Sequence, residues 1–87
     1  MVDASDRALL RAFGNTIRRR RESLAISQEK LAELAHLHRT YVGSVERGER
    51  NLALINIRRF AVALDLSMGD LLDAVADELR PNYRSPG

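Results

Sequence analysis

The sequence predicts an all-α fold, a compact domain of five short helices. Hydrophobic residues make up 45% of the 87 residues but aromatic residues only 5%, so aliphatic side chains and alanine must fill the core, which favours packed helices. Apolar residues recur at spacings of three and four along most of the chain, the period of a helix with one buried face. The length suits one domain, residues 1–87, with an ordered core of about residues 6–80.

The outer helices are placed by their apolar stripes and by the residues at their ends. The first is expected over about residues 6–23, a fourth after Leu54, and a fifth after the N-cap Ser67. The fifth should end at or before Arg80, because Pro81 disfavours a helical residue ahead of it. The first five residues and the tail are expected to be loose.

Residues 27–48 predict two short helices joined by a tight turn. The first begins at the N-cap Ser27, and the turn falls at residues 36–38. The turn has no glycine, so either His36 takes a strained backbone conformation or the turn is slightly open. The second helix covers residues 39–47.

The second of these helices has two different kinds of face. Val42 and Val45 are expected to point inward. The other faces carry basic, hydroxylic and aromatic residues: Arg39, Thr40, Tyr41, Ser44 and Arg47. A surface of this kind can donate hydrogen bonds to phosphates and base edges.

Two short motifs stand at the ends of this helix, Leu37-His38-Arg39-Thr40-Tyr41 and Glu46-Arg47-Gly48-Glu49-Arg50-Asn51. Through them the segment resembles the helix-turn-helix of Cro and phage-repressor-type regulators, including bacterial restriction-modification controller proteins. The resemblance covers about residues 14–76 and implies a lambda-repressor-like DNA-binding domain, with the helix-turn-helix at 27–48 and a recognition helix at 39–47. The implied function is sequence-specific transcriptional regulation at an operator, and a restriction-modification controller is its sharper version.

The recognition helix offers candidates for reading bases. Arg39 suits a bidentate contact with guanine O6 and N7, and Thr40 and Ser44 suit contacts with base edges. Tyr41 has two interpretations: it contacts a phosphate or a flexible pyrimidine–purine step, or it braces the domain. Gly43 and Ser44 are smaller than the polar residues that relatives often carry there, so DNA shape is expected to carry part of the specificity.

Further DNA contacts are implied by the resemblance. Gln28 matches a glutamine that contacts a phosphate, and Arg50 and Asn51 match residues that contact the DNA backbone. The alternative is that Arg50 and Asn51 are solvated turn residues. Arg47, at the far end of the recognition helix, joins this set of candidates.

Two other positions decide how firmly the recognition helix is held. The resemblance pairs Arg21 with Glu46, a structural ion pair that locks the first helix to the recognition helix. His38 stands at the N-cap, where the family generally has Ser, Asp or Asn, so the helix is expected to begin less firmly.

A homodimer is expected, because a single small domain reads only a few base pairs. Two copies would place their recognition helices about one turn of DNA apart, matching a pseudo-palindromic operator. The fifth helix is the expected interface, through Leu66, Met68, Leu72, Val75 and Leu79. The alternative is that these residues complete the core, and for Leu71 the core is preferred.

The composition argues against several other classes of protein. There is no cysteine, hence no disulfide framework and no thiolate nucleophile. His36 and His38 have no evident third ligand, so neither a metal nor another cofactor is expected, and no nucleophile or glycine-rich phosphate loop indicates an enzyme. No apolar run approaches the length of a membrane span and no signal peptide is evident, so a cytoplasmic protein is expected.

The charge distribution favours nucleic acid over the alternative partner, a protein. Residues 1–50 carry ten Arg or Lys against seven Asp or Glu, giving +3, and residues 51–87 carry four against five, giving −1. The alternative function is an antitoxin or antirepressor module whose helices bind a protein. Such a helix would not need the polar set Arg39, Thr40, Arg50 and Asn51.

Overall fold

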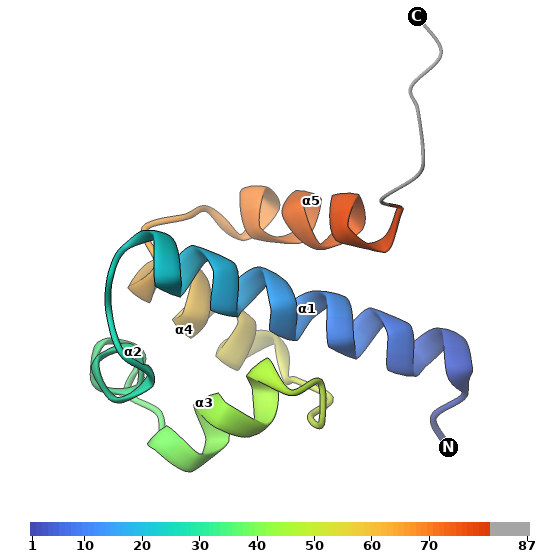
Figure 1. Cartoon of the computed structure of the whole chain (residues 1–87), viewed down its shortest axis with the longest axis horizontal. Helices are drawn as coiled ribbons and strands as arrows, with labels where there is room; N and C mark the ends of the chain where they lie inside the picture. The colour runs from blue at the N-terminus through green and yellow to red at the C-terminus, as the bar shows by residue number, and fades with distance from the viewer. Residues whose placement is uncertain (81–87) are drawn as a thin grey trace, which may run out of the picture.

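The computed structural model describes residues 1–80 and contains five helices in that range. They are α1 (Ala4–Ser23), α2 (Gln28–Ala35), α3 (Arg39–Glu46), α4 (Leu54–Ala63) and α5 (Met68–Leu79). The all-α prediction is confirmed. Figure 1 shows α1 running the length of the molecule, with α5 along one side of it and α3 along the other. The predicted tail after Arg80 lies outside the described residues.

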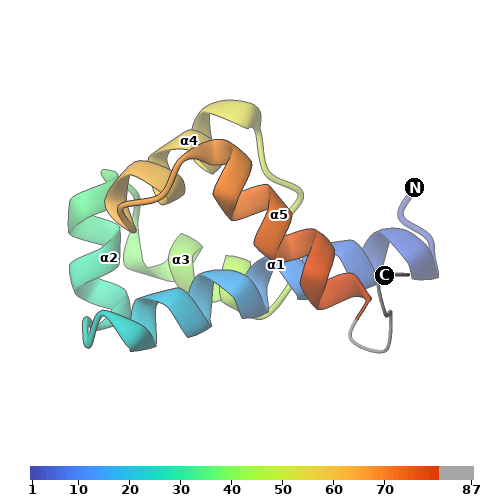
Figure 2. The same ribbon diagram turned by 90° about the horizontal axis from the view of Figure 1, so that it is seen from above.

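One hydrophobic core joins all five helices. Its largest fully buried side chains include Ile17 of α1, Phe60 of α4 and Leu71 of α5. Phe13 meets Phe60 edge to face, with ring centroids 6.2 Å apart. In Figure 2, seen from above, α5 crosses over α1. The helix-turn-helix therefore rests on a base built from α1 and α4, with α5 closing the far side.

The first helix begins two residues earlier than the sequence predicted. Asp3 is its N-cap: the Asp3 carboxylate accepts from the Asp6 backbone N–H at 2.8 Å, and the Asp6 carboxylate accepts from the Asp3 N–H at 3.2 Å. This reciprocal capping box satisfies two backbone donors and draws the start of the helix toward the N-terminus. The expectation of a loose segment through residue 5 is therefore wrong for Ala4 and Ser5.

Three of the helices end in a left-handed residue that is not glycine. Ala25, His36 and Asp65 have φ values of 57°, 57° and 58°. After each of them an apolar residue donates its N–H back across the helix end, and these residues are Ile26, Leu37 and Leu66. All three pack against the core. Burial of the apolar residue offsets the steric cost of the left-handed one, in the manner of a Schellman motif.

Candidate nucleic-acid interface

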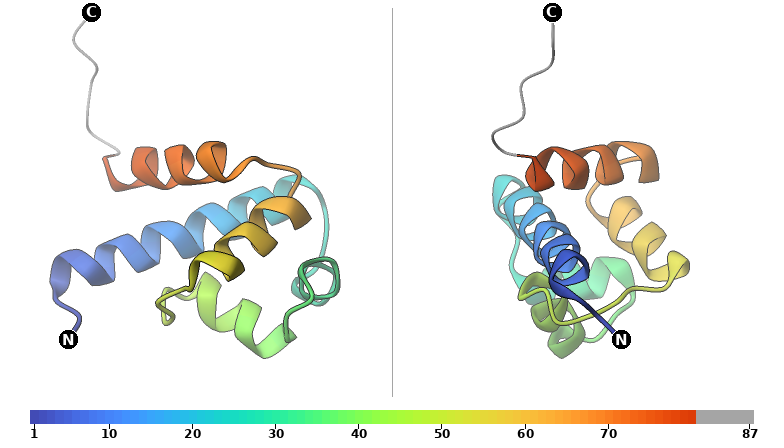
Figure 3. Two further views of the ribbon diagram at one scale, coloured as in Figure 1. Left: turned by 180° about the vertical axis from the view of Figure 1, so that it is seen from behind. Right: turned by 90° about the vertical axis from the view of Figure 1, so that its right-hand side faces the viewer.

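The turn between α2 and α3 has the strained form of the two that the sequence left open. His36 lies in the left-handed region (φ 57°, ψ 44°), and Leu37 packs into the core. His38 is the N-cap of α3 and makes no side-chain capping hydrogen bond, as its residue type predicted. Figure 3 shows α3 at the edge of the molecule, on the side away from α5. The recognition helix is thus presented on one face by a rigid base.

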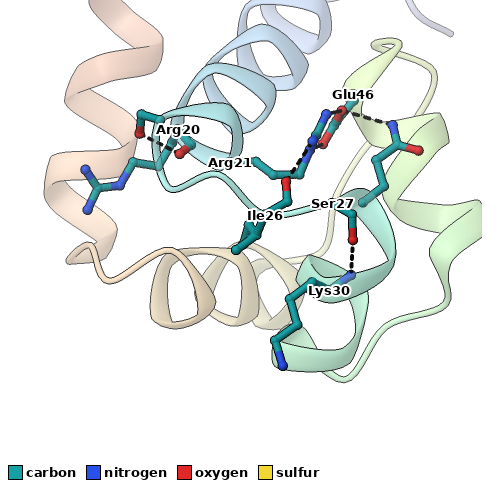
Figure 4. Close-up of polar contacts among 8 residues, drawn as sticks. Arg20, Arg21, Ile26, Ser27, Lys30 and Glu46 are labelled. Carbon is teal, nitrogen blue, oxygen red and sulfur yellow. Dashed lines mark hydrogen bonds and ion pairs between the residues drawn. The ribbon is translucent and has the colours of Figure 1, made fainter.

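The predicted ion pair between Arg21 and Glu46 is present and bidentate (Figure 4). Arg21 Nε donates to Glu46 Oε2 at 2.7 Å, and Arg21 Nη2 donates to Glu46 Oε1 at 3.0 Å. Arg21 Nη1 also donates to the carbonyl of Ile26 at 3.0 Å, at the entry to α2. The hydrogen bond that Arg21 donates to the Glu46 carboxylate raises the pKa of Arg21. One guanidinium therefore ties α1 to both helices of the motif.

Gln28, the predicted phosphate contact, also belongs to this cluster. Its Nε2 donates to Glu46 Oε1 at 3.0 Å, and the side chain is half-buried at the first position of α2. A Cβ at Gly43 would lie 3.7 Å from the Gln28 amide oxygen, an ordinary van der Waals contact, so this arrangement does not itself require a glycine. Gln28 thus contacts the recognition helix directly.

The exposed residues of the interface lie at the two ends of α3. Arg39 and Thr40 are exposed at its first two positions. Arg47, just beyond its last residue, is exposed and pairs with Glu49, with Arg47 Nε 3.0 Å from Glu49 Oε2. This pairing raises the pKa of Arg47 and lowers that of Glu49. Sequence reasoning did not predict a role for Glu49. The only signal in the sequence was its position between Arg47 and Arg50, either of which could pair with its carboxylate.

Ser44 does not lie on the outward face where the sequence placed it. It is only 4% exposed, because α1, α2 and the segment after α3 surround the C-terminal half of this short helix. Its hydroxyl donates to the carbonyl of Tyr41 at 2.7 Å and accepts from Arg50 Nε at 3.0 Å. The predicted surface position is therefore wrong, and the hydroxyl has partners within the protein.

Tyr41 is half-buried and braces the domain, one of its two predicted roles. Its ring stacks on Phe60 with centroids 6.5 Å apart and planes 20° apart. Its hydroxyl accepts from Asn56 Nδ2 at 3.2 Å, and the Arg50 guanidinium lies 5.7 Å from the ring centroid. A contact of Tyr41 with DNA stays a prediction. Asn56 was missed by sequence reasoning, because only the folded chain brings α4 beside the recognition helix.

The predicted dimer face of α5 is largely used inside the monomer. Val75 is 3% exposed in the core and is not available as free apolar surface, whereas Leu66 and Met68 are partly buried against that core. Leu71 is buried, as preferred. Leu72 and Leu79 are 43% and 41% exposed. The stripe is split because α1 and α4 cover one side of α5 and leave the other open.

Other exposed apolar residues lie near Leu72. A groove of about 130 Å³ runs between α1, the segment before α4, and α5, and its lining includes Leu9, Leu52 and Leu72. Leu9, Leu54 and Ile55 are themselves exposed. Exposed apolar residues are therefore found on α1 and at the start of α4 as well as on α5.

Residues 1–80 show neither a metal site nor a membrane helix. In this range no group of three or more His, Cys, Asp or Glu side chains is arranged to hold a metal ion. None of the described helices is long and apolar enough to cross a membrane.

A five-helix domain that exposes Arg39 and Thr40 at the start of the second helix of a helix-turn-helix belongs to a class of DNA-binding protein. The helix-turn-helix family matches residues 17–71. Control protein C.BamHI of Bacillus amyloliquefaciens is 48% identical over 62 residues, covering 70% of this chain and 76% of that protein. The restriction-modification controller protein C.AhdI of Aeromonas hydrophila is 48% identical, with a TM-score of 0.69 over 71% of this chain and 94% of that chain. The chain belongs to the helix-turn-helix family and, within it, to the restriction-modification controller proteins.

A further controller protein has been solved with DNA. The C.Esp1396I tetramer in complex with its natural 35 base-pair operator has a TM-score of 0.76 and 28% identity, over 82% of this chain and 93% of that chain. The family is one of DNA-binding regulators rather than of enzymes.

Proposed function

We propose that this protein is a sequence-specific transcriptional regulator that binds a pseudo-palindromic operator as a homodimer, in the manner of a restriction-modification controller. The observation that carries the proposal is the pair of exposed side chains at the start of α3, Arg39 and Thr40, on a helix locked in place by Glu46. The controller protein solved with its operator supports the same function. The basic N-terminal half of the chain, at +3, suits a polyanionic partner.

The two ends of α3 would make different kinds of contact. Arg39 and Thr40 would read base edges in the major groove, where an arginine recognises guanine and a threonine offers both a hydroxyl and a methyl group. Arg47, Arg50 and Asn51, at and beyond the far end, would contact phosphates. Such contacts fix the register of the protein on the duplex without reading sequence. Gln28 would add a phosphate contact at the N-terminus of α2, where backbone N–H groups also favour an anion.

The homodimer would form through the apolar surface that the monomer leaves exposed. We assign to it five of the exposed apolar residues, Leu9, Leu54, Ile55, Leu72 and Leu79. Leu72 and Leu79 come from the interface expected on α5. Leu9 of α1 lines the same groove as Leu72, and Leu54 and Ile55 are the first two residues of α4. A Leu72→Glu variant should shift the molecular mass in light scattering at tens of micromolar from dimer to monomer, and an unchanged mass would remove this surface from the interface.

The experiment that tests the function is selection of bound duplexes from a random DNA pool at near-physiological salt, followed by sequencing. The expected result is an inverted repeat with half-sites about one turn apart. Recovery of only salt-sensitive, sequence-independent binding would contradict the proposal. It would also favour the alternative function, an antitoxin or antirepressor module that binds a protein. In this function the protein would need no cofactor and would catalyse no reaction. It would act in the cytoplasm, where the operator DNA lies.

A further inference from the structure

The Ser44 hydroxyl is directed into the protein rather than toward DNA. It donates its hydrogen to the backbone carbonyl of Tyr41 at 2.7 Å, and it accepts from Arg50 Nε at 3.0 Å. A serine hydroxyl has a single hydrogen to donate, and here that hydrogen is engaged within α3. The residue is almost fully buried. Arg50 is the one side chain of the described residues that is hydrogen-bonded to Ser44, and it offers a route by which Ser44 can affect DNA binding.

The Tyr41 ring gives Arg50 a second, fixed contact. The guanidinium carbon lies 5.7 Å from the ring centroid, within the range of a cation–π interaction. The ring itself is held by stacking on Phe60 and by the hydrogen bond from Asn56 to its hydroxyl. The arginine thus rests on a ring that the core and α4 keep in place.

These two contacts leave one edge of the Arg50 guanidinium free. Ser44 takes the Nε–H, and the two terminal nitrogens make no hydrogen bond within residues 1–80. The side chain as a whole is exposed. Four N–H groups in a planar fork therefore remain for a partner, and a fork of this shape matches two oxygens of one phosphate.

We infer that Ser44 is a positioning residue of the DNA interface. Together with the Tyr41 ring it holds the Arg50 guanidinium as a preformed fork for a DNA phosphate. An arginine that is already ordered loses less side-chain freedom when it binds, so the hydrogen bond inside the protein strengthens a contact outside it. The inference rests on the proposed DNA-binding function and goes beyond it, because it assigns the small hydroxyl at position 44 a role other than base reading.

A double-mutant cycle tests the inference. The dissociation constants of wild type, Ser44→Ala, Arg50→Ala and the double variant are measured on the selected operator duplex by fluorescence anisotropy. Ser44→Ala should weaken binding by roughly 3-fold to 10-fold, the range for immobilising one flexible side chain, and Arg50→Ala should weaken it more. The double variant should bind as Arg50→Ala does, since Ser44 acts through Arg50. Losses that simply multiply would overturn the inference.

The salt dependence gives a readout that a general loss of stability would not change. Arg50→Ala should lower the slope of log K against log salt by about one, because one phosphate contact is lost. Ser44→Ala should keep the wild-type slope, because the charge remains and only its positioning is lost. A slope lowered equally by both variants would contradict the assigned role.

Ser23→Ala is a matched control. Ser23 Oγ donates to the carbonyl of Arg20, three residues earlier, at 2.6 Å, just as Ser44 donates to the carbonyl of Tyr41. Unlike Ser44, Ser23 accepts no hydrogen bond from an arginine within residues 1–80. Ser23→Ala should therefore leave operator affinity unchanged. If it weakened operator binding as much as Ser44→Ala does, the effect of Ser44 would be one of helix stability alone.

Arg50→Lys covers the case in which Ser44→Ala fails to fold. It keeps the charge but has neither the Nε–H nor the planar fork, so it should bind less tightly than wild type with the same salt slope. Wild-type affinity of this variant would overturn the inference. Failure of the proposed function itself would appear in the wild type, as no preference for any duplex.

Discussion

The two ends of the recognition helix are held in opposite ways. At the C-terminal end Glu46 accepts from Arg21 and Gln28, and the neighbouring Ser44 is tied to the next segment. At the N-terminal end His38 provides no capping hydrogen bond, and Arg39 and Thr40 are exposed. One end is fixed by charge and hydrogen bonds, while the other is left open to solvent.

The difference shows how a very short helix can read DNA. Eight residues are too few to form a stable helix alone, so packing must supply the stability of α3. Because the C-terminal end is anchored to α1 and α2, the whole helix behaves as one rigid element. The orientation of the exposed residues is then set by contacts a turn or more away from them. The anchored end therefore sets the orientation of α3, and the open end carries the residues proposed to read DNA.

The largest expected effect comes from breaking the anchor. Arg21→Ala leaves the Glu46 carboxylate, whose side chain is 3% exposed, without its opposite charge. Removing one partner of such a pair costs about 3–5 kcal/mol in the free energy of unfolding. Urea denaturation followed by circular dichroism measures this. A loss below about 1 kcal/mol would mean that α3 is anchored by its apolar contacts alone.

Two further variants define the nature of that effect. Arg19→Ala breaks the exposed pair with Glu78, in which the arginine side chain is 66% exposed, and should cost at most about 1 kcal/mol. The double replacement of Arg21 by Met and Glu46 by Leu should regain much of the stability lost in Arg21→Ala, because two apolar side chains remove the need to pair a buried charge.

The sequence predicted the exposure of Arg39 and Thr40 at the open end and the ion pair of Glu46 at the anchored end, but not the burial of Ser44. The caps Ser27 and Ser67 and the apolar stripes place the helices, because these signals are local. The burial of Ser44 is not a local property: it depends on the segment after Gly48 returning to α3 and laying Arg50 over it. An eight-residue helix with neighbours on several sides has no single buried stripe for periodicity to find.

The dimer face shows the same limit. On α5, Val75 and Leu72 both belong to an apolar stripe, and spacing alone cannot tell which of them α1 and α4 cover. The structure buries Val75 and exposes Leu72. Leu9 comes from a distant part of the sequence, so only the folded chain reveals it as an exposed apolar neighbour of Leu72.

The next effect in size concerns the open end, where Arg39→Ala should change sequence preference and leave folding intact. Loss of one bidentate base contact is expected to reduce discrimination between operator and random DNA by about 1–3 kcal/mol. Competition binding with the selected duplex and a scrambled one measures it. Arg58→Ala, an exposed arginine on α4, is the control and should not alter the ratio. Equal losses on both duplexes would assign Arg39 to the phosphate backbone instead.

The smallest expected effect comes from capping the open end, through His38→Ser. The backbone of His38 already has the extended N-cap conformation (φ −74°, ψ 143°), close to that of Ser27 (φ −78°, ψ 166°). Ser27 Oγ accepts from the N–H three residues on, at 2.9 Å, so a serine at position 38 can accept from the Tyr41 N–H without moving the chain. The free energy of unfolding should rise by about 0.5–1 kcal/mol, while Ser27→Ala should lower it by about 1 kcal/mol. No gain in urea denaturation would mean that the His38 side chain already stabilises the start of α3. A gain in the free energy of unfolding together with unchanged operator affinity would show that DNA reading requires Arg39 and Thr40 to be exposed, and does not require an uncapped helix start.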